Sequence, residues 1–219
     1  MYRFLLLSVC LFSLSHVTYA ATETFESIQL NGQASSGSGW SSNWNGDNGY
    51  KVVGINIPSE GEQHVKITPI VDNFVKINRR IATTSSSTIY FDVKVDTLSG
   101  YIRGDLNLYS NNTLLMRVLY GTGISFQQLD LLYWTGTINN WYRQSTTFPN
   151  DTYVTIGIQF DQVNQGNKYR INMNGGSWSP WMTMYNNPTF NGVNTIELGA
   201  SNYNAVSGGS LYYDHIIVN

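Results

Sequence analysis

The sequence predicts an all-β protein, specifically a two-sheet antiparallel β-sandwich of the jelly-roll type. Residues 89–95 and 154–160 each alternate strictly between apolar and polar side chains. Such alternation is typical of a strand with one buried face. Further short strand-like runs are separated by turn residues, and no segment combines a helical period with capping residues. Many short strands of this spacing favour a sandwich over other β folds.

The remaining strands are expected in order along the chain. They are predicted at Phe25 and over residues 50–56, 62–70, 74–82, 104–110, 114–120, 124–134, 141–148, 168–174, 195–200 and 211–218. Turn signals separate several of them, at Ser110-Asn111-Asn112, at residues 164–167 and at Asn174-Gly175-Gly176. No linker interrupts the pattern, so residues 21–219 are expected to form one domain.

The first 20 residues have the pattern of a cleavable secretory signal. Arg3 precedes an apolar stretch from Phe4 to Leu14, and the small residue Ala20 precedes a polar segment. Cleavage after Ala20 would remove Cys10, the one cysteine of the chain. We therefore expect a secreted protein, extracellular or periplasmic, that has no disulfide.

Composition narrows the range of partners. Charged residues make up 12% of the chain and the formal net charge is -2. No basic stripe indicates nucleic acid or an anionic membrane surface, and no apolar run is long enough to predict membrane insertion. Aromatic residues make up 14%, including 15 Tyr and 6 Trp. This mixture is common in domains that meet polysaccharides, and it also suits any turn-rich sandwich.

A series of short phrases occurs in a fixed order over residues 21–219. They are ETFES, NGQASSGSGWSSNW, EQHVKI, INRRI, IYFDVKVD, NWYRQSTTF, TIGIQFD, YRINMNGG and LYYDHIIV. In this order they resemble the concanavalin A-like, laminin-G-like jelly-roll domains of secreted bacterial proteins. The opening and closing phrases are also similar to those of several carbohydrate-binding module families. The resemblance implies a jelly-roll sandwich and a lectin-like function.

Asp214 lies in the last predicted strand, where alternation places it on the same face as Ile216 and Val218. A carboxylate directed toward a core needs donors, a cation or a metal. The resemblance implies that Glu26 and Asp214 share a structural Ca²⁺, which binds six to eight oxygens. The alternative is that Asp214 accepts backbone N–H groups or pairs with Arg79, Arg80 or Lys66, with Glu26 in solvent.

The motifs of related enzymes are missing. The Glu-x-Asp-x-x-Glu strand of retaining laminarinases does not occur, nor do the Gln-x-His and Tyr-x-Lys strands of jelly-roll alginate lyases. Gly-x-Ser-x-Gly and phosphate-binding glycine loops are also missing. We therefore predict no catalytic residues. One catalytic alternative stays open, which is a pair of carboxylates on two different strands. Its members would be two of Asp92, Asp105, Asp130, Asp161 and Glu197.

Sugar rings rest on aromatic faces while polar side chains meet their hydroxyls. The candidate ligand-binding residues are Tyr109, Arg117, Trp134, Trp178 and Trp181. Tyr109 is expected on one outward face with Asp105 and Asn107, and the two leucines beside Arg117 leave its burial open. Trp134, Trp178 and Trp181 are either stacking platforms or loop anchors. Trp40 and Trp141 are expected to pack in the core.

These observations predict a secreted, non-catalytic carbohydrate-binding domain whose partner is an extracellular or cell-surface polysaccharide. One alternative is a glycoside hydrolase or polysaccharide lyase of concanavalin-like fold. A second alternative is an adhesive or structural surface protein whose partner is another protein, because Tyr, Asn and Gly also serve protein interfaces.

Overall fold

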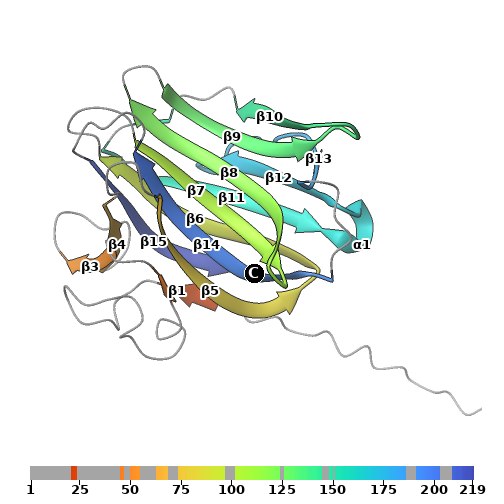
Figure 1. The fold of residues 1–219 in the computed structure, drawn as a ribbon, viewed down its shortest axis with the longest axis horizontal. Coiled ribbons are helices and arrows are strands. Elements are labelled where there is room, and N and C mark those ends of the chain that lie inside the picture. The colour runs from red at the N-terminus through yellow and green to blue at the C-terminus, as the bar shows by residue number, and fades with distance from the viewer. Residues whose placement is uncertain are drawn as a thin grey trace, which may run out of the picture.

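The computed structural model describes residues 21–23, 45–46, 50–54, 63–68, 74–96, 102–123, 126–144, 148–149, 151–185, 191–202 and 209–219. They form two antiparallel sheets packed face to face (Figure 1). The predicted leader, Phe25, Glu26 and Trp40 lie outside the described residues. Among the described residues, no helix has the length and apolar character needed to cross a membrane.

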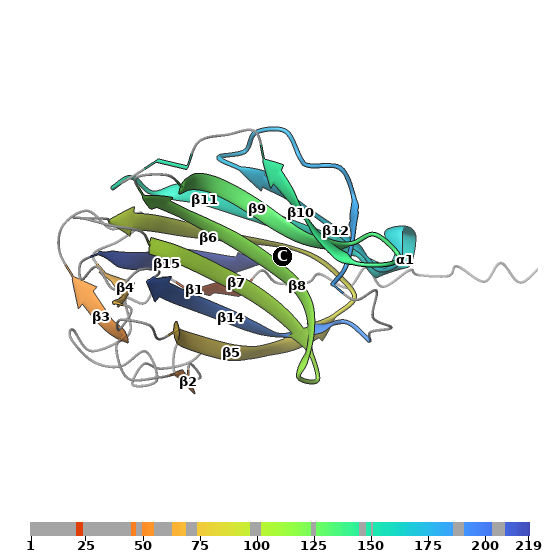
Figure 2. The same ribbon diagram turned by 45° about the horizontal axis from the view of Figure 1, so that its top comes forward.

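The strands of each sheet are not in chain order, so the connections cross between the sheets. Sheet A contains β13 (Met182–Thr183), β12 (Lys168–Met173), β11 (Val154–Asp161), β6 (Ser86–Asp96), β15 (Ser210–Val218), β4 (Gln63–Ile67) and β3 (Tyr50–Gly54), and β1 (Ala21–Glu23) pairs with β15. Sheet B contains β10 (Asn139–Gln144), β9 (Phe126–Trp134), β8 (Thr113–Gly123), β7 (Ile102–Ser110), β14 (Val193–Asn202), β5 (Phe74–Thr84) and β2 (Asn45–Gly46). From β5 to β10, sheet B can be followed from bottom to top in Figure 2.

The predicted fold class is confirmed, and most of the predicted strands are present within a few residues. Alternation could not find β1, β2 and β13, because strands of two or three residues contain no repeat. It also missed α1 (Gln162–Gln165), which follows β11. The carboxylate of Asp161 caps this turn by accepting the N–H groups of Val163 and Asn164, both at 3.1 Å.

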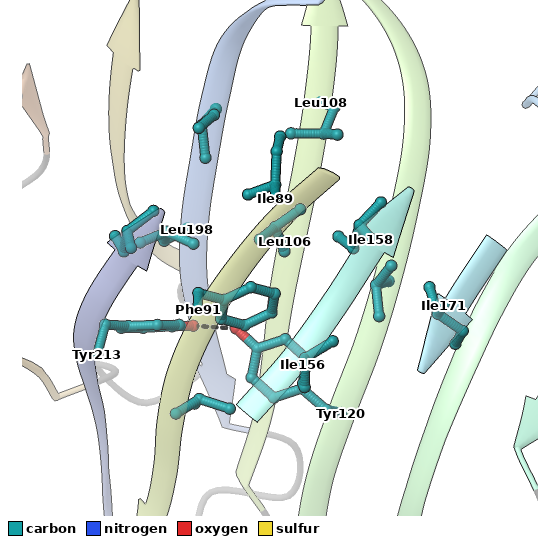
Figure 3. Packing of buried hydrophobic residues seen from close by; sticks show 14 of the residues in the cluster. Ile89, Phe91, Leu106, Leu108, Tyr120, Ile156, Ile158, Ile171, Leu198 and Tyr213 are labelled. Atoms are coloured by element: carbon teal, nitrogen blue, oxygen red, sulfur yellow. Dashed lines mark hydrogen bonds between the residues drawn. The ribbon is translucent and has the colours of Figure 1, made fainter. Parts of the chain in front are cut away.

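The core fills the space between the two sheets, with aromatic rings at its centre (Figure 3). Phe91 of β6 packs against Tyr120 of β8 and Tyr213 of β15. The Tyr120 hydroxyl donates to the Tyr213 hydroxyl, which donates to the Gly199 carbonyl of β14 at 2.8 Å. Gly104 leaves room for Tyr120, since a Cβ there would lie 2.1 Å from a ring carbon. Buried polar groups thus link sheet B to sheet A and back again.

The expected orientation of Asp214 is wrong. His215 has φ +45°, and the register of β15 with β6 shifts between Asp214 and Ile217. This bulge adds one residue, so Tyr213 and Ile216 both reach the core. Asp214 follows Tyr213 and therefore points to the outer face of sheet A, although it is fully buried. Its Oδ1 accepts the N–H of His215 at 2.8 Å. A backbone N–H was one of the partners expected for Asp214 in place of a metal.

Candidate functional site

A row of register partners crosses the outer face of sheet B, the face turned away from the core. Partners in adjacent strands point to the same face. The row contains Trp141 of β10, Arg117 of β8, Asn107 of β7, Glu197 of β14 and Asn78 of β5, and it crosses β9 at the backbone of Leu132. Four strand spacings separate Trp141 from Glu197, which is about 19 Å at ~4.8 Å per strand. We call these five residues the cross-strand row.

Trp141 is exposed at one end of this row, contrary to the expectation that it packs in the core. It keeps 41% of its surface exposed. Its neighbour Tyr142 turns inward and packs against the core instead. A single exposed apolar side chain is common on a protein surface, so the exposure shows that the ring is accessible to a partner and no more. The ring offers an aromatic face beside the polar part of the row.

Glu197 is the centre of a hydrogen-bonded network in the row. Its Oε1 accepts from Asn107 Nδ2 at 3.1 Å and from the Tyr109 hydroxyl at 2.9 Å, and its Oε2 lies 3.0 Å from Lys76 Nζ. Arg117 Nε donates to Asn107 Oδ1 at 2.9 Å. These contacts connect β5, β14, β7 and β8. Because the network fixes the side chains, Tyr109 and Arg117 are held in one orientation.

Asp105 lies beside this network and is almost fully buried, with 3% of its surface exposed. Its register partner on β14 is Gly199, and its Oδ1 is 3.2 Å from Arg103 Nε. Burial raises the pKa of Asp105 to about 6, and the charge of Glu197 adds to the rise while Arg103 and Arg117 oppose it. Burial and then Glu197 also raise the pKa of Tyr109. The Asp105 carboxyl group, with its raised pKa, therefore shares this face with the side chain of Glu197.

A polar pocket of about 310 Å³ lies next to the network. It forms where β5 and β14 meet the turn between β7 and β8, and it is lined by Arg80, Ile81, Thr83, Asn111, Asn112, Asn194 and Thr195. Thr195 is the register partner of both Tyr109 and Arg80. The predicted turn at Asn111-Asn112 is present, with positive φ at both residues. Amides, a hydroxyl and a guanidinium suit a ligand rich in hydroxyl groups.

The five predicted ligand-binding residues do not form one site. Tyr109 and Arg117 come together on sheet B, and Tyr109 shares its face with Asp105 and Asn107 as predicted. The backbone of Trp134 ends β9 in the same sheet, opposite Asn139. Trp178 and Trp181 lie over Arg170, which points outward from sheet A between the core residues Tyr169 and Ile171. They belong to the opposite side of the sandwich.

The predicted calcium ligands are only partly described, because Glu26 lies outside the described residues. The register partner of Asp214 is Asp92, whose Oδ1 accepts from Thr155 Oγ1 at 2.6 Å and whose Oδ2 lies 3.7 Å from His215 Nδ1. Carboxylate oxygens are suitable Ca²⁺ ligands. Within the described ranges, no group of three or more His, Cys, Asp or Glu side chains is placed to hold a metal. Calcium at Glu26 and Asp214 stays a prediction.

His64 belongs to the same outer face of sheet A. It keeps 1% of its surface exposed, and its Nδ1 lies 3.0 Å from the Tyr153 hydroxyl. Its ring packs edge-on against Tyr212, over which Lys94 lies at 4.7 Å. Burial, together with Lys94 and Lys66, lowers the pKa of His64 to about 4. The imidazole is therefore neutral at physiological pH.

Sequence reasoning missed Trp141, Glu197 and Lys76 as members of the site. Glu197 was predicted only as one possible member of a carboxylate pair, and no local pattern indicated that Lys76 would lie beside it. Only the pairing of β14 with both β5 and β7 brings these residues together. For Trp141, the signal lay in the adjacent pair Trp141-Tyr142, because only one of two neighbours in a strand can face the core.

The fold was compared with known proteins. No protein-family model and no curated protein sequence matches the chain. Among solved structures, the GH16 protein of the Bacteroides ovatus mixed-linkage glucan PUL, in complex with a product, has a TM-score of 0.60 at 11% identity, covering 91% of this chain and 99% of its own. A carbohydrate esterase from the Shiga toxin-encoding bacteriophage phi24B has a TM-score of 0.58 at 14% identity, covering 90% and 98%.

A third structure is the CBM2 module of the evolved Dit of Lactobacillus casei BL23 phage J-1. It has a TM-score of 0.57 at 11% identity and covers 90% of this chain and 93% of its own. The chain has the concanavalin A-like jelly-roll fold. This confirms the resemblance that the ordered phrases predicted. At such low identities the likeness concerns the fold alone, so function must be argued from the site.

Proposed function

We propose that this protein binds a polysaccharide, without cleaving it, on the outer face of sheet B. The observation that carries the proposal is the exposed Trp141 ring in the same cross-strand row as Arg117, Asn107 and Glu197. An aromatic face and ordered polar groups within about 19 Å match a few sugar units. The likeness to carbohydrate-active and carbohydrate-binding structures supports the same ligand class.

The role of each residue in the cross-strand row follows from how exposed its side chain is. Trp141 is the exposed member, so a sugar ring would rest its C–H groups on this side chain. Arg117 and Tyr109 are half-buried and reach the surface from the network, so they would meet hydroxyl groups. Glu197 and Asn107 are buried at 7% and 1% exposure and act as positioning residues. Because their orientation is fixed before binding, less conformational entropy is lost when the ligand docks.

A glycan array with the purified protein tests this proposal. We expect binding to at least one polysaccharide, and Arg117→Gln should weaken that binding while Lys168→Gln, on sheet A, should not. Both substitutions remove one positive charge, so a difference between them reports position rather than net charge. No binding to any glycan, together with capture of a defined envelope protein, would instead support the adhesive function.

Glycoside hydrolysis is the second candidate, and one observation favours it. Asp105 and Glu197 lie on adjacent strands and on one face, and the pKa of Asp105 is raised to about 6. An acid of raised pKa beside a second carboxylate is the pattern of glycosidases. However, Asp105 is nearly inaccessible and Glu197 already has three partners. Release of reducing ends by the wild type, and its loss in Asp105→Asn, would establish hydrolysis.

A further inference from the structure

Arg170 lies over the rings of two tryptophans on the outer face of sheet A. Its guanidinium carbon lies 5.0 Å from the ring centroid of Trp178 and 4.6 Å from that of Trp181. Both distances fall in the range of cation–π contacts. Arg170 Nε donates to Oε1 of Gln159, its register partner on β11, at 2.7 Å. Two rings and one hydrogen bond therefore fix the guanidinium plane.

Among the described residues, the terminal nitrogens of this guanidinium have no hydrogen-bond partner. Within the described part of the chain, the Nε bond to Gln159 is the one hydrogen bond that Arg170 makes, and no carboxylate pairs with it. Arg170 is half-buried, so part of the residue faces solvent. The bond from Nε to Gln159 does not use the edge formed by Nη1 and Nη2. This edge presents parallel N–H groups, which match the two oxygens of a carboxylate.

The loop that carries Trp178 and Trp181 does not need Arg170 to hold it in place. Ser179 N–H donates to the Ile171 carbonyl at 2.8 Å, and the Ile171 N–H donates to Ser179 Oγ at 3.1 Å. Met184 N–H also donates to the Asn167 carbonyl at 2.8 Å. Since backbone bonds already anchor the loop, the rings serve to orient Arg170. Each ring gives one face to the guanidinium, so neither is a simple sugar platform.

We propose that Arg170, held by Trp178, Trp181 and Gln159, binds the carboxylate of a uronic acid unit in an acidic polysaccharide. Arg170 has no carboxylate partner among the described residues, so its charge is matched by one carboxylate of a ligand. The choice of a saccharide over an acidic peptide rests on the function proposed for sheet B. The site itself is separate, because Arg170 projects from the opposite face of the sandwich. The protein would then contact two saccharide segments at once, which raises avidity if both are reachable.

Isothermal titration of the purified protein with an oligogalacturonate and with its fully methyl-esterified form tests the proposal. The two probes share their rings and differ in charge. We expect the acid form to bind and Arg170→Lys to weaken it about tenfold, because lysine keeps the charge but loses the two-pronged geometry. Ile138→Ala, at an exposed residue that belongs to neither site, should leave this binding unchanged. Equal binding of the ester, or no effect of Arg170→Lys, would overturn the proposal.

A measurement on the wild type tests the proposal even if the Arg170→Lys variant does not fold. The NMR signal of the Arg170 Nε–H should shift when the oligogalacturonate is added and should not shift with the ester. A Glu-rich peptide that binds more tightly through Arg170 would overturn the saccharide assignment in favour of a protein partner. Equal Arg170-dependent binding of a sulfated oligosaccharide without uronic acid would overturn the carboxylate assignment. If Trp141→Ala abolishes neutral glycan binding while oligogalacturonate fails to bind, the sheet B function stands and this inference fails.

Discussion

The Tyr120 hydroxyl on sheet B donates a hydrogen bond to the Tyr213 hydroxyl on sheet A, and both side chains are fully buried. The Tyr213 hydroxyl donates its own hydrogen bond to the Gly199 carbonyl at 2.8 Å. Burial raises the pKa of both phenols, so both stay protonated and able to donate. The pair therefore fixes the relative position of the two sheets below the proposed binding face.

Phenylalanine at these positions should have unequal effects. Tyr120→Phe removes one hydrogen bond, while Tyr213 still donates to Gly199, so we expect a loss of about 1 kcal/mol in the free energy of unfolding. Tyr213→Phe removes the bond to the Gly199 carbonyl and leaves the buried Tyr120 hydroxyl without its acceptor, so we expect about 2 to 4 kcal/mol. Urea unfolding measures both. The double variant should be no less stable than Tyr213→Phe, and equal losses in the two single variants would contradict this ordering.

Glu197 variants should separate charge from hydrogen bonding in the network. Glu197→Gln keeps an acceptor for Tyr109 and Asn107 and loses the contact with the partly exposed Lys76, so we expect a stability loss of about 1 kcal/mol or less. Glu197→Ala removes the acceptor of the buried Asn107 amide and of the half-buried Tyr109 hydroxyl, and about 2 to 3 kcal/mol should be lost. Both should lower the pKa of Tyr109, whose rise is due partly to Glu197. Ultraviolet titration of the phenol checks this, and an unchanged pKa would argue against the contact.

Two buried groups should give the stability opposite pH dependences. The folded-state pKa of Asp105 is raised from 3.8 to about 6, so its contribution is greatest at low pH and is lost as pH rises from about 4 to 6. The pKa of His64 is lowered from 6.5 to about 4, so stability is lost as pH falls from about 6.5 to 4. Each shift corresponds to about 3 kcal/mol at most.

These opposing trends partly cancel in the wild type, and single variants should reveal them. Relative to the wild type, Asp105→Asn should gain stability as pH rises from 4 to 6, and His64→Gln should gain stability as pH falls from 6.5 to 4. Thermal melting across this range measures the differences. Parallel pH curves for the wild type and both variants would show that neither group is titrating as the structure implies.

The bulge at His215 should be sensitive to the shape of the side chain. His215 has φ +45°, a region that β-branched residues avoid and asparagine tolerates. We expect His215→Val to cost about 1 to 2 kcal/mol and His215→Asn to cost less. Chemical denaturation of the two variants checks this order. If valine is tolerated as well as asparagine, the bulge does not depend on the left-handed conformation.

The strands were predictable because each inner face is lined by apolar residues at every second position, as in Ile89, Phe91 and Val93. Local signals could not reveal the bulge at His215, since one residue in a left-handed conformation reverses the faces that follow it. Nor could they reveal the network around Glu197, which depends on the register between β14 and β7. The face of Tyr109 was predictable because the extra residue at the register shift, Leu115, lies in β8, so β7 itself alternates without interruption to Tyr109.

The exposed ring of Trp141 is the most direct test of the proposed function. Ile138 is the matched control, because it is exposed at 61% in the turn before the same strand. Calorimetric titration with a polysaccharide that the array identifies should show binding weakened about tenfold in Trp141→Ala, a difference of ~1.4 kcal/mol. Ile138→Ala should bind like the wild type, and the melting temperatures of both variants should stay close to it. Unchanged binding in Trp141→Ala, or equal loss in Ile138→Ala, would contradict glycan recognition by the outer face of sheet B.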